Sequence, residues 1–535
     1  MIVLLTSTEP ELDPHRRQVS ERLQRDGNGV YTIRYPPASP VPKERIAAIR
    51  DADVVVCIVG ASNGPELPDG TGYGETEVMT ARRLGIDVLA YARDDVGAPN
   101  RPRDPQHEYS VARARRFKSW LREHYGIRRF FTPQELVTSV VEDLNALRSD
   151  ARVAGPSVVR QLQRRLQAGV NMTFDAAAVS LHNMDAIYRV EQIAPGREEH
   201  VDSPRVSQGG GGANVVYALA RLGAATAVAG CTAADADGAA LRADLERAGV
   251  NPDFLLQLDP GDPLRTGRTT ILADGSGQMT ILTETGANSR FAAEVAARGL
   301  REPLLQALTR SRIVLLTAFS TVAERRLQED LLEHLPADTL VAFTPGSLYM
   351  SPGSRLASII ARTNVIFISE EALGRLLDEL APHLSDRSSS IPQKAHALIS
   401  WRHDLGSHQP LMLVIRQGWR GYEARDRLGQ IYVCWGQHGY EGGVRTDGRL
   451  SSDDVDKVID STGTGGALAA GVLYGLLRSR PPEDCANLAY VLAMSVTTRY
   501  GSRAGVPSLS DIAQQWCYWL KTDVAPDWLG PAPSV

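Results

Sequence analysis

Residues 460–466 read Asp460-Ser461-Thr462-Gly463-Thr464-Gly465-Gly466, and they run directly into an apolar helical pattern from Ala467 to Leu477. Small residues at the start of a helix leave backbone N–H groups accessible to an anion. The segment therefore has the frame of a phosphoryl-transfer loop. It lacks, at its end, a side chain that could act as a base.

A second glycine-rich segment, Gly209 to Asn214, also precedes an apolar helical pattern, Val215 to Leu222. Glycines at such a position let backbone N–H groups approach a ligand closely. A run of glycines alone is equally typical of a flexible loop. Further motifs favour a ligand site, namely Asn183-Met184-Asp185 after an apolar strand and Gly286-Ala287-Asn288 after a hairpin-like pair of strands.

Together these motifs resemble those of the PfkB carbohydrate kinase family, in particular its ribokinase and adenosine kinase branches. That family has N-x-D after its first strand, G-G-x-G-A-N at the next helix, then T-x-G-x-x-G and a late D-T-x-G-A-G-D loop. The counterparts here are Asn183 with Asp185, Gly209 to Asn214, Arg416 to Gly421 and Asp460 to Gly466. The resemblance covers about residues 171 to 515.

The resemblance implies contacts between the hydroxyls of a sugar or nucleoside and Asn183, Asp185, Gly209, Gly210 and Asn214. A carboxylate and an amide together can pair with neighbouring hydroxyls as acceptor and donor. It also implies an anion hole at Gly463, Thr464 and Gly465, where N–H groups would stabilise charge on the transferring phosphoryl group. For the sugar-side residues, a purely structural turn is the alternative interpretation.

Three positions depart from the family pattern. The aspartate that takes the proton from the acceptor hydroxyl is replaced by Gly466, and glycine cannot accept a proton. The metal-associated N-x-x-E falls at Ile368 to Glu371, which leaves Glu371 as the candidate Mg²⁺ ligand. The first threonine of T-x-G-x-x-G is Arg416, followed on the nucleotide side by Gly418 and Gly421. The resemblance also makes Asp460 a candidate for a loop that holds a monovalent cation.

Loss of a positioned general base commonly lowers a rate by about 10²- to 10⁴-fold. The sugar side keeps its residues while the catalytic and nucleotide sides have changed, as in a binding module derived from a kinase. We therefore expect a protein that binds a small-molecule sugar, nucleoside or nucleotide, with lost or weak phosphotransferase activity. The alternative is an active ATP-dependent kinase. The resemblance implies ATP and Mg²⁺, and the sequence itself establishes neither.

An independent α/β pattern precedes this region, in which short apolar runs alternate with helical patterns in the rhythm of a parallel sheet. Strands are expected at residues 2–5, 30–34, 54–59 and 88–91, and helices at 16–25, 43–50 and 76–84. The predicted organisation is a doubly wound, flavodoxin-like domain over 1–150, a linker over 151–170, a ribokinase-like α/β domain over 171–520 and a tail over 521–535.

Within the larger domain, one large sheet is expected to contain all strands, including Thr269 to Leu272. The polar segment Ala381 to Gln409 interrupts the α/β rhythm. We therefore expect this segment to be an excursion on the surface.

The N-terminal region contains Leu5 to Thr8 after a strand, Asp51 to Asp53 before another, and Gly72 to Glu77 before a helix. It resembles a domain family related to nucleoside deoxyribosyltransferases and TIR domains. In those groups a glutamate serves ribosyl-bond cleavage, because a carboxylate can attack or stabilise an oxocarbenium-like centre. The resemblance implies an N-glycosidase acting on NAD or a nucleoside, with Glu77 and Glu75 as candidates. Alternatively, both glutamates only favour the positive end of the helix, by about 0.3–1 kcal/mol.

Composition limits the partners. A net charge of −5 gives no global attraction to nucleic acid or anionic lipid. The five cysteines are scattered and form no CxxC pair, which argues against a disulfide framework and favours a reducing, cytoplasmic setting. The N-terminus has no basic leader and no segment offers about 20 uncharged apolar residues, so we expect neither secretion nor membrane insertion. The family resemblance makes a homodimer a reasonable expectation.

Overall fold

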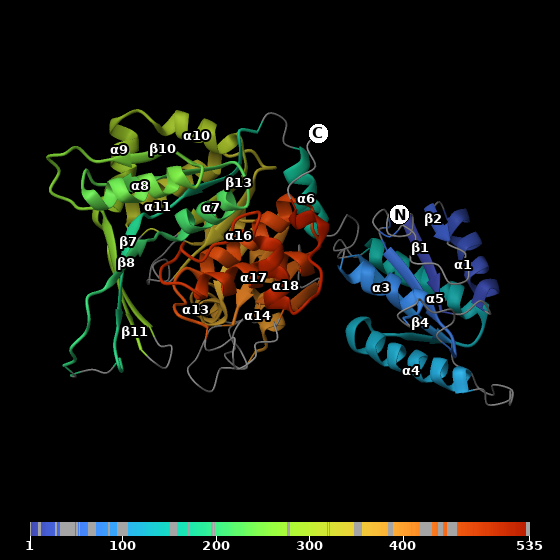
Figure 1. Ribbon diagram of the computed structural model, residues 1–535. Helices are drawn as coiled ribbons and strands as arrows, with labels where there is room; N and C mark the ends of the chain where they lie inside the picture. Colours follow the sequence, from blue (N-terminus) through green and yellow to red (C-terminus); the bar gives the residue numbers. More distant parts are fainter. Residues whose placement is uncertain are drawn as a thin grey trace. The chain divides into compact units, whose positions relative to one another are not determined.

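The computed structural model of the chain describes residues 2–8, 12–26, 29–32, 49, 52, 54–62, 71–83, 86–93, 105–149, 158–168, 172–193, 196, 198–274, 279–317, 319, 321–346, 356–382, 389–407, 409–417, 431–436, 442–446 and 457–530. The chain divides into two compact units, Met1–Arg160 and Gln161–Val535 (Figure 1). Helix α6 (Val158–Ala168) contains the division between them. No described helix is long and apolar enough to cross a lipid bilayer.

The described part of the first unit is built on a parallel sheet with strand order β2-β1-β3-β4-β5. This is the flavodoxin-like order of a doubly wound fold, so the predicted fold class is confirmed. The elements are β1 (Ile2–Ser7), α1 (Asp13–Arg25), β2 (Gly29–Thr32), β3 (Val54–Val59), α3 (Tyr73–Arg83), β4 (Asp87–Arg93), α4 (Pro105–Tyr125), β5 (Arg128–Phe130) and α5 (Pro133–Ser149).

Strand β3 is buried along its whole length, as expected for an apolar strand with helices on both faces. Helices α1 and α5 cover one face, where Val56 packs with Phe130. Helices α3 and α4 cover the other, where Cys57 packs with Phe117. The helix predicted over residues 43–50 lies outside the described residues apart from Ile49.

The described part of the second unit contains two sheets. The larger has the order β10-β9-β6-β13-β14-β15-β16-β17-β18, and the smaller β12-β11-β7-β8. The strands are β6 (Phe174–Val179), β7 (Asn183–Arg189), β8 (Arg205–Gln208), β9 (Thr226–Thr232), β10 (Val250–Gln257), β11 (Gly267–Ala273), β12 (Met279–Glu284), β13 (Ser311–Thr317), β14 (Leu340–Thr344), β15 (Val365–Ser369), β16 (Leu411–Arg416), β17 (Ile431–Gly436) and β18 (Gly442–Thr446).

Helices cover both faces of the larger sheet (Figure 1). Those from α9 to α14 pack on one face, in a core that includes Leu316, Phe343 and Leu413. Helix α16 contacts both α7 and α17, which pack on strands of the larger sheet. The helices are α7 (Gly211–Arg221), α8 (Ala236–Arg247), α9 (Phe291–Ala297), α10 (Arg301–Thr309), α11 (Val322–His334), α12 (Leu356–Arg362), α13 (Glu370–Leu380), α14 (Ile391–Asp404), α16 (Thr464–Leu477), α17 (Pro482–Thr497) and α18 (Ile512–Leu520).

Two expectations about this unit are wrong. Thr269 to Leu272 does not join one large sheet, because β11 pairs with β7 and β12 in the smaller sheet. The segment Ala381 to Gln409 is not a surface excursion, because it contains α14, which buries Ile391, Leu398 and Arg402. The guanidinium of Arg402 donates to four backbone carbonyl groups, which offsets its burial. Alternation of apolar residues does not indicate which sheet a strand joins.

Helices α16 and α17 approach each other closely at two glycines. A Cβ atom at Gly471 would lie 2.5 Å from Cα of Ala489, and one at Gly475 would lie 2.6 Å from Sγ of Cys485. The absence of side chains at these positions therefore sets the spacing of the helix pair. Because the loop at residues 460–466 leads into α16, this spacing also positions the loop.

Substitution of two helical glycines by alanine should have opposite effects. Gly471→Ala should lower the melting temperature, because overpacking against backbone costs about 1–3 kcal/mol. Gly374→Ala in α13 should raise it, because a Cβ there would meet nothing within 4 Å and the helix gains roughly 0.5–1 kcal/mol. Differential scanning calorimetry would measure both. A rise in both variants would contradict the close approach of α16 and α17.

Candidate functional site

A cavity of about 480 Å³ lies at the carboxyl edge of the larger sheet, where open α/β sheets commonly bind ligands. Strands β14, β15 and β16 contribute Thr344, Ile368 and Arg416 at their carboxyl ends. The first turns of α7 and α16 border it, and strands β7, β11 and β12 of the smaller sheet line its other side. The cavity therefore lies between the two sheets of this unit.

Asp185 on β7 is the acidic residue of the predicted sugar side. Its carboxylate is buried and accepts a hydrogen bond from the hydroxyl of Ser502, at 3.2 Å from Oγ to Oδ2. A Cβ atom at Gly209 would lie 2.1 Å from the same oxygen, so a glycine is required beside the carboxylate. Asp185 lines the cavity together with Gly210 and Asn214. The structure thus brings these three predicted residues together.

Asn183 also lines the cavity, but its side chain is hydrogen-bonded to other residues of the protein. Its Nδ2 donates to Oγ1 of Thr269 at 3.0 Å, and its Oδ1 accepts from Nδ2 of Asn288 at 2.9 Å. Asn288, the last residue of the Gly286 to Asn288 motif, also bonds both the N–H and the C=O of His182. This pair of amides holds the start of β7 in place and so orients Asp185.

Arg503 is the buried cation that organises the first turn of α7. Its Nε donates to Oδ1 of Asn214 at 2.8 Å, and Nη2 donates to the carbonyl of Gly209 at 2.9 Å. Nη1 lies 2.8 Å from Oδ2 of Asp244, and the guanidinium lies over the ring of Tyr217. Arg503 therefore orients the amide of Asn214 toward the cavity. The sequence analysis missed Arg503 and Ser502, because nothing local indicates that an arginine will be buried.

Asp460 joins the anion loop to the segment that carries Ser502. One carboxylate oxygen accepts the N–H of Thr462 at 2.9 Å, and the other accepts the N–H of Gly501 at 2.8 Å. Gly463 has φ of 86°, and a Cβ there would lie 2.5 Å from Cα of Ser502. Only glycine fits this position. In the structure Asp460 has a bridging role, and a bound monovalent cation remains a prediction.

The first turn of α16 presents free backbone donors to the cavity. The N–H groups of Gly465 and Gly466 bond no acceptor among the described residues, as expected in the first turn of a helix. A Cβ at Gly465 would meet nothing within 4 Å, so the backbone borders free space. Gly463 and Gly465 line the cavity, whereas Thr464 lines a smaller cavity beside it. This geometry suits an anion hole.

The position of the missing base is closely packed. A Cβ atom at Gly466 would lie 3.0 Å from Cβ of Asn214. Among the described residues, Asp185 is the one carboxylate that lines the cavity. Glu371 lies outside it, because its side chain is 64% exposed and lies 3.9 Å from Arg375. Gly418 and Gly421 lie outside the described residues.

Arg416 separates the main cavity from a second, smaller one of about 60 Å³. Its Nη1 donates to Oγ1 of Thr464 at 3.0 Å, and burial lowers its pKa. The smaller cavity has apolar residues on its walls, including Ile431, Leu468 and Met494. The predicted nucleotide-side residue is therefore next to the anion loop.

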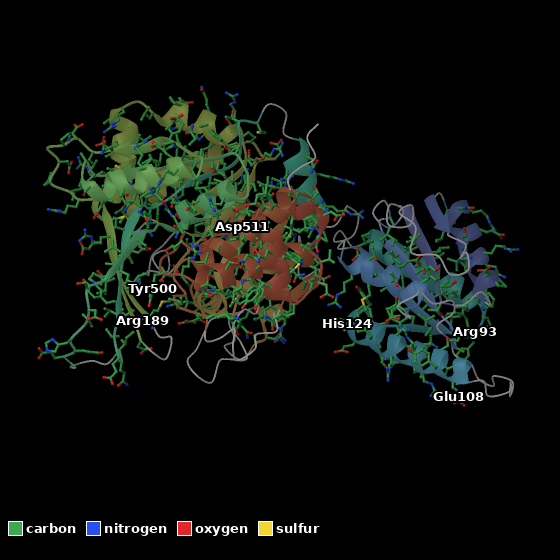
Figure 2. The ribbon with its side chains drawn as sticks, viewed as in Figure 1. Arg93, Glu108, His124, Arg189, Tyr500 and Asp511 are labelled. Carbon is green, nitrogen blue, oxygen red and sulfur yellow. The ribbon has the colours of Figure 1, made fainter. Side chains whose placement is uncertain are left out.

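Tyr500 precedes Gly501 and Ser502, which hydrogen-bond Asp460 and Asp185 respectively. Its ring contacts two arginines of the smaller sheet. The guanidinium groups of Arg189 and Arg205 lie 5.7 and 3.8 Å from the centre of its ring. Figure 2 labels Arg189, at the end of β7, and Tyr500 in this region. These cation–π contacts help to hold the smaller sheet over the cavity.

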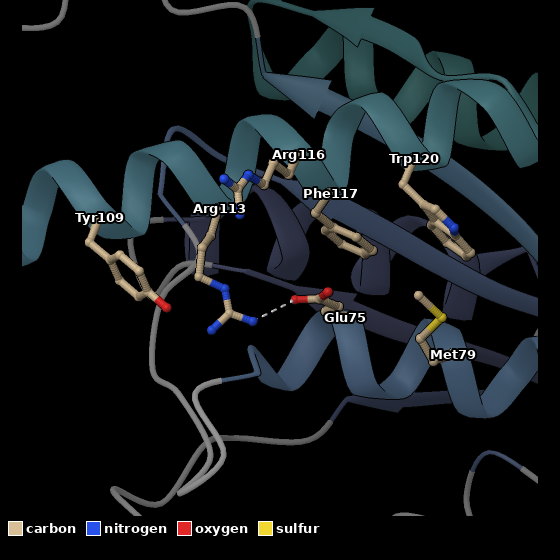
Figure 3. A pocket seen from close by; sticks show the side chains of 7 residues that line it. All are labelled: Glu75, Met79, Tyr109, Arg113, Arg116, Phe117 and Trp120. Carbon is tan, nitrogen blue, oxygen red and sulfur yellow. Dashed lines mark hydrogen bonds and ion pairs between the residues drawn. The ribbon is translucent and has the colours of Figure 1, made fainter. Parts of the chain in front are cut away.

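The N-terminal unit has a cavity of its own, of about 560 Å³, between α3 and α4 (Figure 3). Glu75 lines it, with its carboxylate 3.4 Å from the guanidinium of Arg113. Tyr109, Phe117 and Trp120 supply aromatic walls. Glu77 is only 2% exposed and does not line this cavity. Of the two candidate glutamates, Glu75 is therefore the one that lines this cavity, and glycosidase activity remains a prediction.

The larger unit combines a mostly parallel sheet, a smaller covering sheet and two glycine-rich loops at the start of helices that border the cavity. The model for the pfkB family of carbohydrate kinases matches residues 173–432 and 443–509. The chain belongs to this family, which confirms the resemblance seen in its motifs. The model for "Domain of unknown function (DUF4062)" matches residues 3–145. The N-terminal likeness to deoxyribosyltransferases and TIR domains stays a prediction.

Two curated relatives match the larger unit. An uncharacterized sugar kinase from Archaeoglobus fulgidus is 26% identical over 298 residues, which cover 55% of this chain and 99% of the relative. An ATP-dependent ribose-1-phosphate kinase from Halopiger xanaduensis is 26% identical over 293 residues, 54% of this chain and 89% of the relative. The ribokinase of Giardia lamblia is 17% identical with a TM-score of 0.51, covering 64% of this chain and 99% of that structure, which supports the fold.

Removal of Arg503 should be strongly destabilising. Arg503→Ala removes the buried partner of Asp244 and of the carbonyl of Gly209, and loss of one member of a buried pair costs about 3–5 kcal/mol. Arg247→Ala is the matched control, because Arg247 also contacts Asp244 but its side chain is 73% exposed. The control should change stability by at most about 1 kcal/mol. Calorimetric melting would compare the two, and equal effects would contradict the role given to Arg503.

Ligand binding should depend on the charge of Asp185. Burial raises the pKa of Asp185 to about 6, although Thr269, Ser502 and Arg503 oppose this rise. Above that pH the ionised carboxylate accepts hydrogen bonds from ligand hydroxyls, and below it this capacity declines. Affinity for a sugar or nucleoside should therefore fall as the pH drops through about 6. Titration calorimetry from about pH 8 to about pH 5 would measure it. Asp185→Asn should bind weakly with no such dependence, and a flat wild-type profile would contradict this role.

Proposed function

We propose that the larger unit binds a sugar, nucleoside or nucleotide and has lost most or all phosphotransferase activity. The observation that carries the proposal is the contrast within one cavity. Asp185, Asn214, Gly463 and Gly465 line this cavity, whereas the position that corresponds to the family's base is Gly466. A site of this kind can retain recognition of hydroxyl and phosphate groups without proton abstraction.

The names of the curated relatives suggest the first ligands to test. One is a sugar kinase, and the other uses ATP and ribose 1-phosphate according to its name. The cavity here combines Asp185 on one side with Arg375 and Arg416 on the other. An acid on one side and cations on the other suit a ligand with both hydroxyl and phosphate groups.

An active kinase is the alternative, and one observation favours it. Asp185 is a carboxylate in the cavity with its pKa raised to about 6, and a general base works best near the operating pH. In this case Asp185 would accept the proton of the acceptor hydroxyl. The alternative requires that the native chain transfers phosphate and that Asp185→Asn abolishes this activity.

Restoration of the base should restore activity. Gly466→Asp should raise phosphoryl transfer from ATP to ribose or adenosine by at least about 100-fold over the native chain. Gly466→Asn is the control, because it has the same size and cannot accept the proton. Radiolabelled phosphate transfer would measure rates, and titration calorimetry would measure binding. A native chain as active as Gly466→Asp would overturn the loss of activity. Absence of binding to sugars, nucleosides and nucleotides would overturn the proposal as a whole.

A further inference from the structure

Arg416 carries a positive charge that the described residues do not neutralise. Its one described hydrogen bond is to the uncharged hydroxyl of Thr464, and it forms no ion pair with a described carboxylate. Burial lowers its pKa, and desolvation is the only cause of this shift. A charged group removed from water without a partner is costly. An anionic ligand beside Arg416 would supply the missing partner.

The surroundings of Arg416 provide further donors for such an anion. Thr464 is the first residue of α16, and the N–H groups of Gly465 and Gly466 have no acceptor among the described residues. Arg416, Gly465 and Gly466 all line the same cavity. Arg375 adds a second guanidinium to the lining. Phosphate oxygens are strong acceptors for both guanidinium and helix N-terminal donors.

The positions that correspond to the family's metal motif do not fit Mg²⁺, which requires oxygen ligands in a near-octahedral arrangement. Ile368 presents carbon atoms to the cavity. The hydroxyl of Ser369 is used as a helix cap, since it accepts the N–H of Ala372 at 3.1 Å. Glu371 lies outside the cavity and pairs with Arg375. The described residues contain no cluster of three or more acidic, histidine or cysteine side chains for a metal.

We infer that Arg416 replaces the metal as the group that neutralises the phosphates of a bound nucleotide, so that nucleotide binding does not require Mg²⁺. This inference rests on the proposed function of the cavity. The phosphates contact the guanidinium of Arg416 and the N–H groups at the start of α16. A divalent cation at the same place would be repelled by Arg416 and Arg375.

Titration of the full chain with ADP, in EDTA and in excess Mg²⁺, tests the inference. The dissociation constants should agree within about threefold. Arg416→Met should weaken ADP binding by at least about tenfold in both buffers and weaken adenosine binding by much less, because adenosine has no phosphate. The melting temperature of Arg416→Met without ligand should equal or exceed that of the native chain, because an unpaired buried charge is removed. Arg326→Met is the control, since Arg326 is an exposed arginine of α11 outside the cavity.

The results separate this inference from the proposed function. If ADP binds more than about tenfold tighter with Mg²⁺, or if Arg416→Met binds ADP like the native chain, the inference is wrong. A lower melting temperature of Arg416→Met would indicate a structural role instead. If adenosine binds and ADP does not, this inference alone fails. If neither ADP, adenosine nor ribose binds, the proposed function fails with it.

Discussion

The buried guanidinium of Arg503 is the group on which the ligand cavity depends. A charge inside a protein must be paired, and Arg503 meets this requirement with Asp244 and with acceptors on Asn214 and Gly209. These partners belong to α8, to the first turn of α7 and to the segment after β8. One side chain thereby fixes three segments, and the neighbouring Ser502 bonds Asp185. These contacts connect the segments that line the predicted sugar side of the cavity.

The anion side depends on a second bridge, made by Asp460 between the loop before α16 and the N–H of Gly501. Because Gly501, Ser502 and Arg503 are consecutive, one short segment positions both sides of the cavity. The contact of Gly463 with Ser502 adds a steric constraint to the same place. Gly466 takes no part in these contacts. The absence of a side chain at Gly466 is therefore compatible with this framework.

The charge distribution in the cavity distinguishes this chain from the family pattern. Arg416 stands at a position where the family motif has threonine, and Ile368 where it has an amide. Ile368 replaces an amide, which could bind a metal, by an apolar side chain. Arg416 replaces a neutral hydroxyl by a positive charge. Asp185 is the described acid on the opposite side. The two arginines of the cavity lining, Arg375 and Arg416, thus lie opposite its one described acid.

The sequence alone determined the features that depend on neighbouring residues. Glycines before apolar helices indicated the loops at residues 209–214 and 460–466, and alternating apolar runs indicated the doubly wound N-terminal unit. Only the tertiary structure decided that β11 joins a separate sheet, that α14 is buried, that Glu371 faces solvent and that Arg503 is enclosed. Ser502 and Asp185 are 317 positions apart and still share a hydrogen bond. Local patterns report backbone preference and periodicity, whereas burial and pairing arise from contacts between distant segments, which no local pattern contains.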